Sequence, residues 1–407
     1  MGTSNFSDWG FERDPSVYLP ADMRDEQYIT DYDWLNVEIA SPALYDTPES
    51  WEEIREVVDA FKAEYWIITP PTAGIHYHYG NGKDYIPFTK IRRMAALFFA
   101  IDPVLVQLHP PHRRANDYCL SNRLYSRIAH GTSAAVDARE IGAEYIEGEP
   151  EFPGNRPRPN PVPRPFRRRT PNLLVPFRRG QLDGYTFDER FVQFFNGSDY
   201  AYGQDLPSLV HDNIGRVNPP RPLEIPFAVR EILRCTNSPT VAQLMRYGSA
   251  ITDRPAYAFR AYSVDFYKRI IAEGNGEISR IYQPKRTIEL RQMASTINSD
   301  EIVAHGKIIM RLCQVAAEME LEELYEVVND CAVAESNGNW YDVFDLLAEF
   351  DLESEAKILA VSVARFRGEI IPEEIEDDRK NAEAAERRAS GRLPWFRWLA
   401  SFINNNK

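Results

Sequence analysis

The sequence predicts an α+β protein, because strand candidates lie between segments of helical periodicity. Apolar side chains recur at helical spacing over residues 51–61 and 91–101, and again from about residue 300 onward. Segments 65–70 (YWIITP) and 73–80 (AGIHYHYG) are rich in aromatic and β-branched residues and end at turn-forming residues, which is typical of strands. Segment 286–292 (RTIELRQ) has the same character, and segment 256–266 (AYAFRAYSVDF) is a further strand candidate.

The overall charge and the absence of long apolar runs exclude some classes of protein. The 407 residues include 47 Lys and Arg against 61 Asp and Glu, a formal net charge of −14. A protein that coats nucleic acid needs a basic surface, so we expect no nucleic-acid partner. No run approaches the ~18 apolar residues of a membrane-spanning helix, and the N-terminus lacks the features of a secretory signal. We therefore expect a cytoplasmic protein without stable membrane insertion.

A segment rich in proline and arginine interrupts the pattern. Nine prolines and eight arginines lie between positions 150 and 182, and no acid lies between 155 and 182. Proline at this density excludes helix and central strand, so residues 150–226 are predicted to be an irregular insertion. It is either a solvated loop or an arm that binds phosphates or an acidic partner, since arginine suits phosphate. Residues 331–407 are predicted to be a helical C-terminal extension.

Polar side chains with metal-binding capacity share faces on the strand candidates. Alternate strand residues point to the same side, so His76 and His78 share one face, and so do Glu289 and Arg291. Imidazole with carboxylate suits Mg²⁺ or Mn²⁺, and a neighbouring arginine suits a phosphate or a carboxylate. Alone, a His-x-His pattern is more often two partly exposed polar residues than a site, and Glu-x-Arg on a strand is commonly a surface ion pair.

A third strand candidate, residues 36–39 (NVEI), adds another carboxylate. Val37 and Ile39 are expected to face the core, and Glu38 the opposite side.

These motifs, in this order, resemble the amidoligase family. The matching segments are WGFERDPSV, VEIASPAL, AGIHYHYG, LHPPHRRANDYCLSNR and RTIELRQMASTINSDEIV. Members of that family are ATP-dependent carboxylate–amine ligases related to glutamine synthetase and glutamate–cysteine ligase, and they are frequent in fungi. The resemblance implies a curved antiparallel sheet of glutamine-synthetase type, backed by helices, whose concave face holds ATP and divalent metal. It also implies that residues 1–149 and 227–330 are two parts of one domain.

The resemblance assigns roles to individual residues. It implies metal ligands at Glu38, His76 and Glu289, and it places His78 beside the nucleotide phosphates. Arg291 would contact the transferred phosphoryl group or the substrate carboxylate, which makes Arg291 and His78 the expected catalytic residues.

Two further matches concern arginines and an aspartate. Arg113 and Arg114 lie where the family has an arginine-rich turn, and they are expected to bind a carboxylate or a phosphate. Asp14 matches the family's Asp-x-Ser segment.

One departure leaves the function open. The relatives begin their sheet with a Gly-x-Glu-x-Glu strand, which we expect this chain to lack, so its metal site would be short of ligands. A homo-oligomer or a partner chain that completes the sheet is one alternative.

The first hypothesis is an ATP- and Mg²⁺-dependent ligase that joins a small-molecule or peptide acid to an amine, in secondary metabolism or peptide modification. The second is a catalytically inactive binding or regulatory protein, and the third is a metal-dependent hydrolase.

Overall fold

The computed structural model describes residues 8–18, 34–110, 113, 118–143, 223–246, 254–264, 286–336 and 341–366. The strands in these ranges are β1 (Gly10–Arg13), β2 (Val37–Ala40), β3 (Gly74–Gly80), β4 (Tyr257–Ala258) and β5 (Thr287–Ala294). The α-helices are α2 (Pro48–Glu64), α3 (Phe88–Leu105), α5 (Asn122–Tyr125), α6 (Ala134–Ile141), α9 (Ile225–Leu233), α10 (Ser238–Leu244), α12 (Ser299–Glu318), α13 (Leu321–Ser336), α14 (Val343–Glu349) and α15 (Glu353–Phe366). Two 3₁₀ helices are η2 (Val106–Leu108) and η4 (Arg260–Tyr262).

The central sheet joins strands from distant parts of the chain. Its order is β3-β5-β4, and both strand pairs are antiparallel. Strands β1 and β2 form a separate antiparallel pair. The prediction of an α+β fold with antiparallel sheets is therefore confirmed, whereas the curvature of the glutamine-synthetase type stays a prediction.

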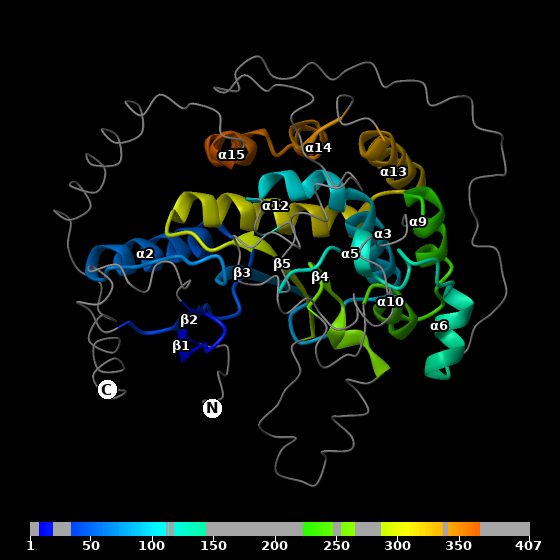
Figure 1. Ribbon diagram of the computed structural model, residues 1–407, viewed down its shortest axis with the longest axis horizontal. Helices are drawn as coiled ribbons and strands as arrows, with labels where there is room; N and C mark the ends of the chain where they lie inside the picture. The colour runs from blue at the N-terminus through cyan, green and yellow to red at the C-terminus, as the bar shows by residue number, and fades with distance from the viewer. Residues whose placement is uncertain are drawn as a thin grey trace, which may run out of the picture.

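Helices cover one face of the central sheet. Ile288 and Leu290 of β5 are buried on this face, and Tyr77 and Tyr79 of β3 pack against the same core. Helix α3 packs against α9, α12 and α13, and α12 also packs against α15. In Figure 1, α13, α14 and α15 lie on one side of α3 and α12, while the sheet lies on the other. The opposite face of the sheet is left to the polar side chains.

The two-stranded sheet is attached to the molecule through α2. Thr47 caps this helix by accepting a hydrogen bond from the Ser50 amide, and Pro48 follows at the first helical position, as the sequence predicts. The ring of Phe11 on β1 stacks on Phe61 of α2, with 5.2 Å between ring centroids. Trp9 Nε1 also donates to Glu53 Oε1 on α2 at 2.7 Å.

The predicted burial of β2 is wrong. Val37 and Ile39 are 37% and 41% exposed, and Glu38 on the other face is exposed as well. A pair of strands covered by a single helix has too little surface to bury both apolar positions, because α2 reaches Phe11 and leaves the facing strand open.

Two predicted strands are shorter or absent. Residues 65–70 follow α2 without strand pairing, and Trp66 within them is 62% exposed. Residues 256–266 contribute only the two residues of β4 before η4 begins. Their aromatic and β-branched composition fits a strand, but a strand also needs a partner to satisfy its backbone groups, and sequence composition does not reveal partners.

The structure describes only some of the segments into which the chain is predicted to divide. Most of the insertion at 150–226 lies outside the described residues, and so does the end of the C-terminal extension from residue 367. The division between residues 330 and 331 falls inside α13. Leu346 and Leu347 of α14 belong to the same buried core as α3 and α12, so the described part of the extension is continuous with the domain.

Candidate functional site

Four polar side chains gather on the face of the central sheet that the helices leave open. His76 and His78 come from β3, and Glu289 and Arg291 come from β5. His78 lies directly opposite Glu289 in the antiparallel register. The shared faces predicted from the two-residue strand period are confirmed, and the pairing of β3 with β5 brings the two sets together.

Glu289 is the centre of this group. Its Oε1 lies 3.5 Å from Nδ1 of His76 and 3.8 Å from Nε2 of His78. The same oxygen contacts Nη1 of Arg291. These side chains are partly exposed, with relative exposures of 27% for His76 and 24% for Glu289, so a ligand can approach the group from solvent.

The surroundings keep His76 neutral. Burial lowers the pKa of His76 to about 3, and the positive charge of Arg291 acts in the same direction, while Glu289 opposes both. An imidazole in this state has a free lone pair at neutral pH, which is the form that binds metal.

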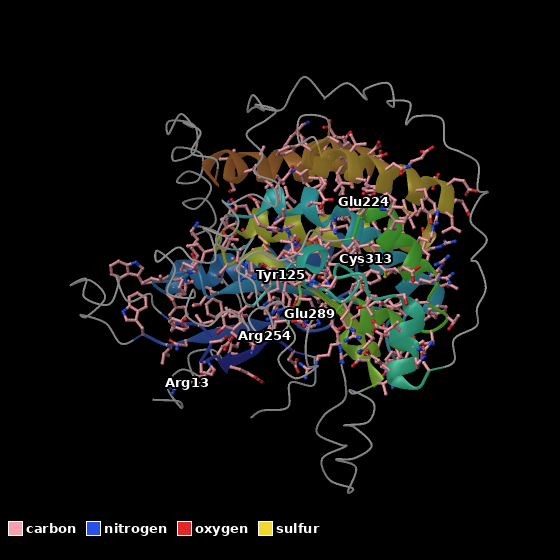
Figure 2. All side chains as sticks on the ribbon, turned by 45° about the vertical axis from the view of Figure 1, so that its right-hand side comes forward. Arg13, Tyr125, Glu224, Arg254, Glu289 and Cys313 are labelled. Atoms are coloured by element: carbon pink, nitrogen blue, oxygen red, sulfur yellow. The ribbon has the colours of Figure 1, made fainter. Side chains whose placement is uncertain are left out.

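Arg291 is fixed at two points. Its Nε donates to the backbone carbonyl of Tyr118 at 2.8 Å, and its Nη1 faces Glu289. Arg254 lies over the ring of Tyr118, with 4.8 Å between its Cζ and the ring centroid. In Figure 2, the labelled residues Glu289 and Arg254 both lie below the C-terminal helices at the top of the view. Arg291 therefore contacts the acid directly, and Arg254 packs on Tyr118, the residue whose carbonyl holds Arg291.

A β-bulge next to the site is held by Arg113. Ile75 pairs with Met293 and Tyr77 with Leu290, so His76 alone faces two residues of β5, Arg291 and Gln292. Arg113 Nε donates to the Gln292 carbonyl at 3.3 Å, and its Nη2 donates to the Arg291 carbonyl.

Arg113 is nearly enclosed, with a relative exposure of 2%. A Cβ atom at Gly74 would lie 2.6 Å from its Nη2, so glycine makes the room for the guanidinium. Its Nε and Nη2 are directed at backbone carbonyls, which gives Arg113 a structural role, and its expected role in binding a phosphate or a carboxylate stays a prediction. Arg114 lies outside the described residues.

Glu38 is not part of this group. It lies on β2, in the separate sheet, where it pairs directly with Glu12 of β1. Among the residues that the structure describes, no group of three or more His, Cys, Asp or Glu side chains could hold a metal ion. The expected cluster of Glu38, His76 and Glu289 is therefore not assembled.

Sequence reasoning missed Glu12. Strand β1 begins with Gly10-Phe11-Glu12, and Asp14 follows the strand, so the chain has a Gly-x-Glu-x-Asp pattern. Strand β1 itself therefore carries one acid, Glu12, and Asp14 lies just past its end, so the expected lack of a Gly-x-Glu-x-Glu strand stays a prediction. The signal was present in the sequence, but it was assigned to the Asp-x-Ser segment. Asp14 is engaged locally, since its Oδ1 accepts from the amide and the hydroxyl of Ser16 at 2.8 and 2.6 Å.

The donor set fits a divalent ion that is shared with a ligand. His76 Nδ1 and Glu289 Oε1 are 3.5 Å apart, and these two side chains would hold such an ion. Mg²⁺ is commonly bound through one or two carboxylates together with phosphates and water, so Glu289 would hold such an ion together with the phosphates of a ligand.

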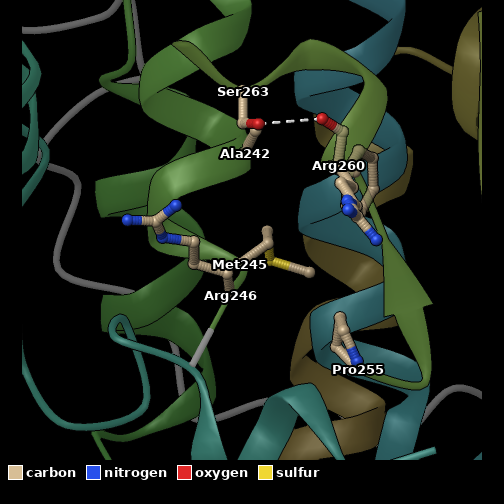
Figure 3. A pocket seen from close by; sticks show the side chains of 7 residues that line it. Ala242, Met245, Arg246, Pro255, Arg260 and Ser263 are labelled. Carbon is tan, nitrogen blue, oxygen red and sulfur yellow. Dashed lines mark hydrogen bonds between the residues drawn. The ribbon is translucent and has the colours of Figure 1, made fainter. Parts of the chain in front are cut away.

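The described residues also enclose one small pocket away from this group. It lies between α10, η4 and Pro255, has room for about one water molecule (about 10 Å³), and is seen in Figure 3. Ser263 Oγ donates to the carbonyl of Arg260 across it at 2.9 Å. The pocket is too small for a substrate and is formed by none of the four site residues.

Comparison with known proteins links the first part of the chain to a family. Residues 2–152 match the family described as "Putative amidoligase enzyme", which confirms for this part of the chain the resemblance seen in the sequence. The match includes Glu12, Glu38, His76 and His78 and ends before β5. No curated protein and no solved structure matches the chain. None of the helices in the described ranges is both long and apolar enough to cross a membrane.

Proposed function

We propose that this protein is an ATP- and Mg²⁺-dependent ligase that joins a carboxylate to an amine. The family match over residues 2–152 supports the ligase class. The observation that carries the proposal is the convergence of His76, His78 and Arg291 on one oxygen of Glu289. A neutral imidazole beside a carboxylate and a fixed arginine is the combination that a metal–nucleotide complex needs.

Activation of a carboxylate explains why such a site is needed. A carboxylate oxygen attacks the γ-phosphorus of ATP, the bond to the β–γ bridging oxygen breaks, and ADP leaves. The amine then attacks the acyl carbon of the acyl phosphate, the carbon–oxygen bond breaks, inorganic phosphate leaves, and the nitrogen loses a proton to solvent. Neither step needs a covalent protein nucleophile, so catalysis depends on positioning and electrostatics.

Each residue of the site has a part in this proposal. Arg291, held by Tyr118 and Glu289, offsets negative charge on the transferred phosphoryl group. His76 and Glu289 hold the divalent ion, which when bound neutralises phosphate charge and orients the phosphates. His78 lies on the same face, two residues farther along β3, and binds at the phosphates or at the acid.

Calorimetric titration of the full chain with ATP and Mg²⁺ tests the proposal. We expect Mg²⁺-dependent binding to the wild type and binding about 10- to 100-fold weaker in Glu289→Gln, because an interaction with a charged group is lost. Glu231→Gln is the matched control, since Glu231 is also partly buried and also pairs with an arginine, at 2.6 Å from Arg234, on α9. Equal affinity in the wild type and in Glu289→Gln would contradict the assignment of Glu289.

The inactive binding protein remains the second candidate, and one observation favours it. Glu289 is already neutralised by Arg291, and no group of three or more His, Cys, Asp or Glu side chains in the described ranges could hold a metal ion. If this candidate is right, the wild type will not bind ATP at millimolar concentration with Mg²⁺. If the ligase is right, the bound ATP will be converted to ADP when a pair of acid and amine substrates is supplied.

A further inference from the structure

A buried polar network lies directly beneath the candidate site. Its centre is Asp102, in the last turn of α3, with a relative exposure of 0%. Oδ1 of Asp102 accepts from Nε2 of Gln292 at 2.7 Å. Its Oδ2 accepts from the Ser121 hydroxyl at 2.6 Å and from the Arg123 amide at 3.0 Å. Both oxygens of the carboxylate are therefore occupied by neutral donors.

Gln292 connects this network to the site. Its Oε1 accepts from the hydroxyl of Tyr257 on β4 at 2.8 Å, so both ends of the amide are fixed. Gln292 follows Arg291 directly and is the second residue of the bulge that faces His76. Its side chain is directed toward Asp102 of α3, whereas the side chain of Arg291 contacts Glu289 on the other face.

Burial of the Asp102 carboxylate carries a desolvation cost that reduces the stability of the fold, so the network needs an explanation. Burial raises the pKa of Asp102 to about 6, although hydrogen bonds from Ser121, Arg123, Gln292 and Tyr257 lower it. An apolar pair at these positions would avoid the desolvation of a carboxylate. A buried polar network of this kind instead specifies one geometry, because any other arrangement leaves a polar group without a partner.

We infer that Asp102 and Gln292 are positioning residues for the candidate site, and that their hydrogen bond holds the β5 bulge so that Glu289 and Arg291 meet His76. The functional importance of this hydrogen bond rests on the proposed function. Its effect on the positions of His76 and His78 can be tested separately. Neither side chain reaches the open face, so neither is a catalytic residue.

Two variants that alter and then exchange the carboxylate and the amide of positions 102 and 292 test the coupling. Gln292→Glu places a second carboxylate beside Asp102, where the glutamine amide now donates, so the two acids repel or share a proton. The double variant Asp102→Asn with Gln292→Glu restores one donor and one acceptor with reversed direction. The asparagine oxygen can still accept from Ser121 and from the Arg123 amide, while its NH₂ donates to the new carboxylate.

The readout is the position of the imidazole NMR signals of His76 and His78, assigned by single His→Gln variants. We expect the signals to shift in Gln292→Glu and to return toward the wild-type positions in the double variant. Asp137→Asn is the control, because Asp137 on α6 is equally buried and pairs with Arg127 at 2.6 Å, remote from β5 in sequence. In the Asp137→Asn protein, His76 and His78 should keep their wild-type signals.

A second measurement relates the coupling to function. Titration with ATP and Mg²⁺ should show about 10- to 100-fold weaker binding in Gln292→Glu, as is usual when a group that orients a metal ligand is changed, with recovery in the double variant. If Gln292→Glu does not fold, Gln292→Met, which has a similar shape and cannot donate to Asp102, replaces it.

The outcomes separate the two proposals. Unchanged His76 and His78 signals in a folded Gln292→Glu or Gln292→Met protein would overturn the positioning role. So would equal shifts in Asp137→Asn, because the effect would then be general destabilisation. Absence of ATP binding in the wild type would overturn the proposed function, while the NMR comparison would still decide the positioning role.

Discussion

Oε1 of Glu289 and Nδ1 of His76 lie 3.5 Å apart, although the two residues belong to opposite halves of the chain. The contact exists only because β5 pairs with β3. The family match ends before β5, so half of the candidate site comes from a part of the chain that the match does not include. Any activity at this site therefore requires the two parts to fold as one unit.

Arg291→Ala should reduce turnover more than nucleotide affinity. Removal of a donor to the developing charge typically costs about 100-fold in kcat, whereas ground-state binding retains the metal ligands. ADP release with a suitable acid and amine measures the first effect, and calorimetry measures the second. A loss of affinity without a loss of kcat would remove Arg291 from the transferred phosphoryl group. Arg254→Ala, which removes the arginine that packs on the Tyr118 ring, serves as the comparison.

Arg113→Met should destabilise the fold. The bulge carbonyls of Arg291 and Gln292 would lose their donor inside the protein, at about 1–3 kcal/mol for each unsatisfied group. Urea unfolding measures the change in the free energy of unfolding. If Arg113 instead binds substrate directly, as the sequence suggested, the free energy of unfolding will stay the same and only ligand affinity will fall.

Gly306→Ala should destabilise α12, although alanine normally favours a helix over glycine by about 1 kcal/mol. A Cβ at Gly306 would lie 2.8 Å from Cζ3 of Trp51 and 3.0 Å from Cε1 of Tyr77, and overpacking of this kind costs about 1–3 kcal/mol. Trp51→Leu removes the closer contact, so the alanine should cost less in that background. An equal cost in both backgrounds would show that Trp51 is not the obstacle.

His305 should make the protein less stable in acid. It lies on α12 with its ring stacked on Tyr77 at 5.3 Å, and burial lowers its pKa to about 3. Its folded pKa lies below the unfolded value of about 6.5, so the unfolded state takes up the proton first, and stability falls as the pH falls from 6.5 toward 3. Between pH 7 and pH 5 the loss from this group is about 2 kcal/mol.

His305→Phe tests this acid dependence. Among the residues that the structure describes, neither ring nitrogen of His305 has a hydrogen-bond partner, so phenylalanine loses no hydrogen bond to them. Urea unfolding at pH 7 and pH 5 should show a drop smaller by about 2 kcal/mol in the variant than in the wild type. The same drop in both proteins would place the acid sensitivity elsewhere.

The sequence predicted local features of the fold and the site well. The helical spacing identified α2, α3 and α12, and the two-residue period placed His76 with His78 and Glu289 with Arg291. These features depend on residues near one another in the chain. The role of each site residue stays a prediction.

What the sequence did not reveal depends on contacts between distant segments. The placement of Glu38 in a separate sheet follows from the pairing of β2 with β1, and the burial of Arg113 follows from the bulge in β5. Asp102 lies in an apolar helix, and its partners come from α5 and β5. No local pattern specifies such partners, because they are chosen by register and packing.

Paramagnetic broadening by Mn²⁺ with ATP, read on the imidazole NMR signals, most directly tests whether the open face of the central sheet is the nucleotide site. Broadening falls steeply with distance from the ion, so the signals of His76 and His78 should broaden first, and that of His130, which precedes α6, should stay sharp. Glu289→Gln should remove the effect. Binding of Mn²⁺ and ATP that leaves His76 and His78 sharp would contradict the site.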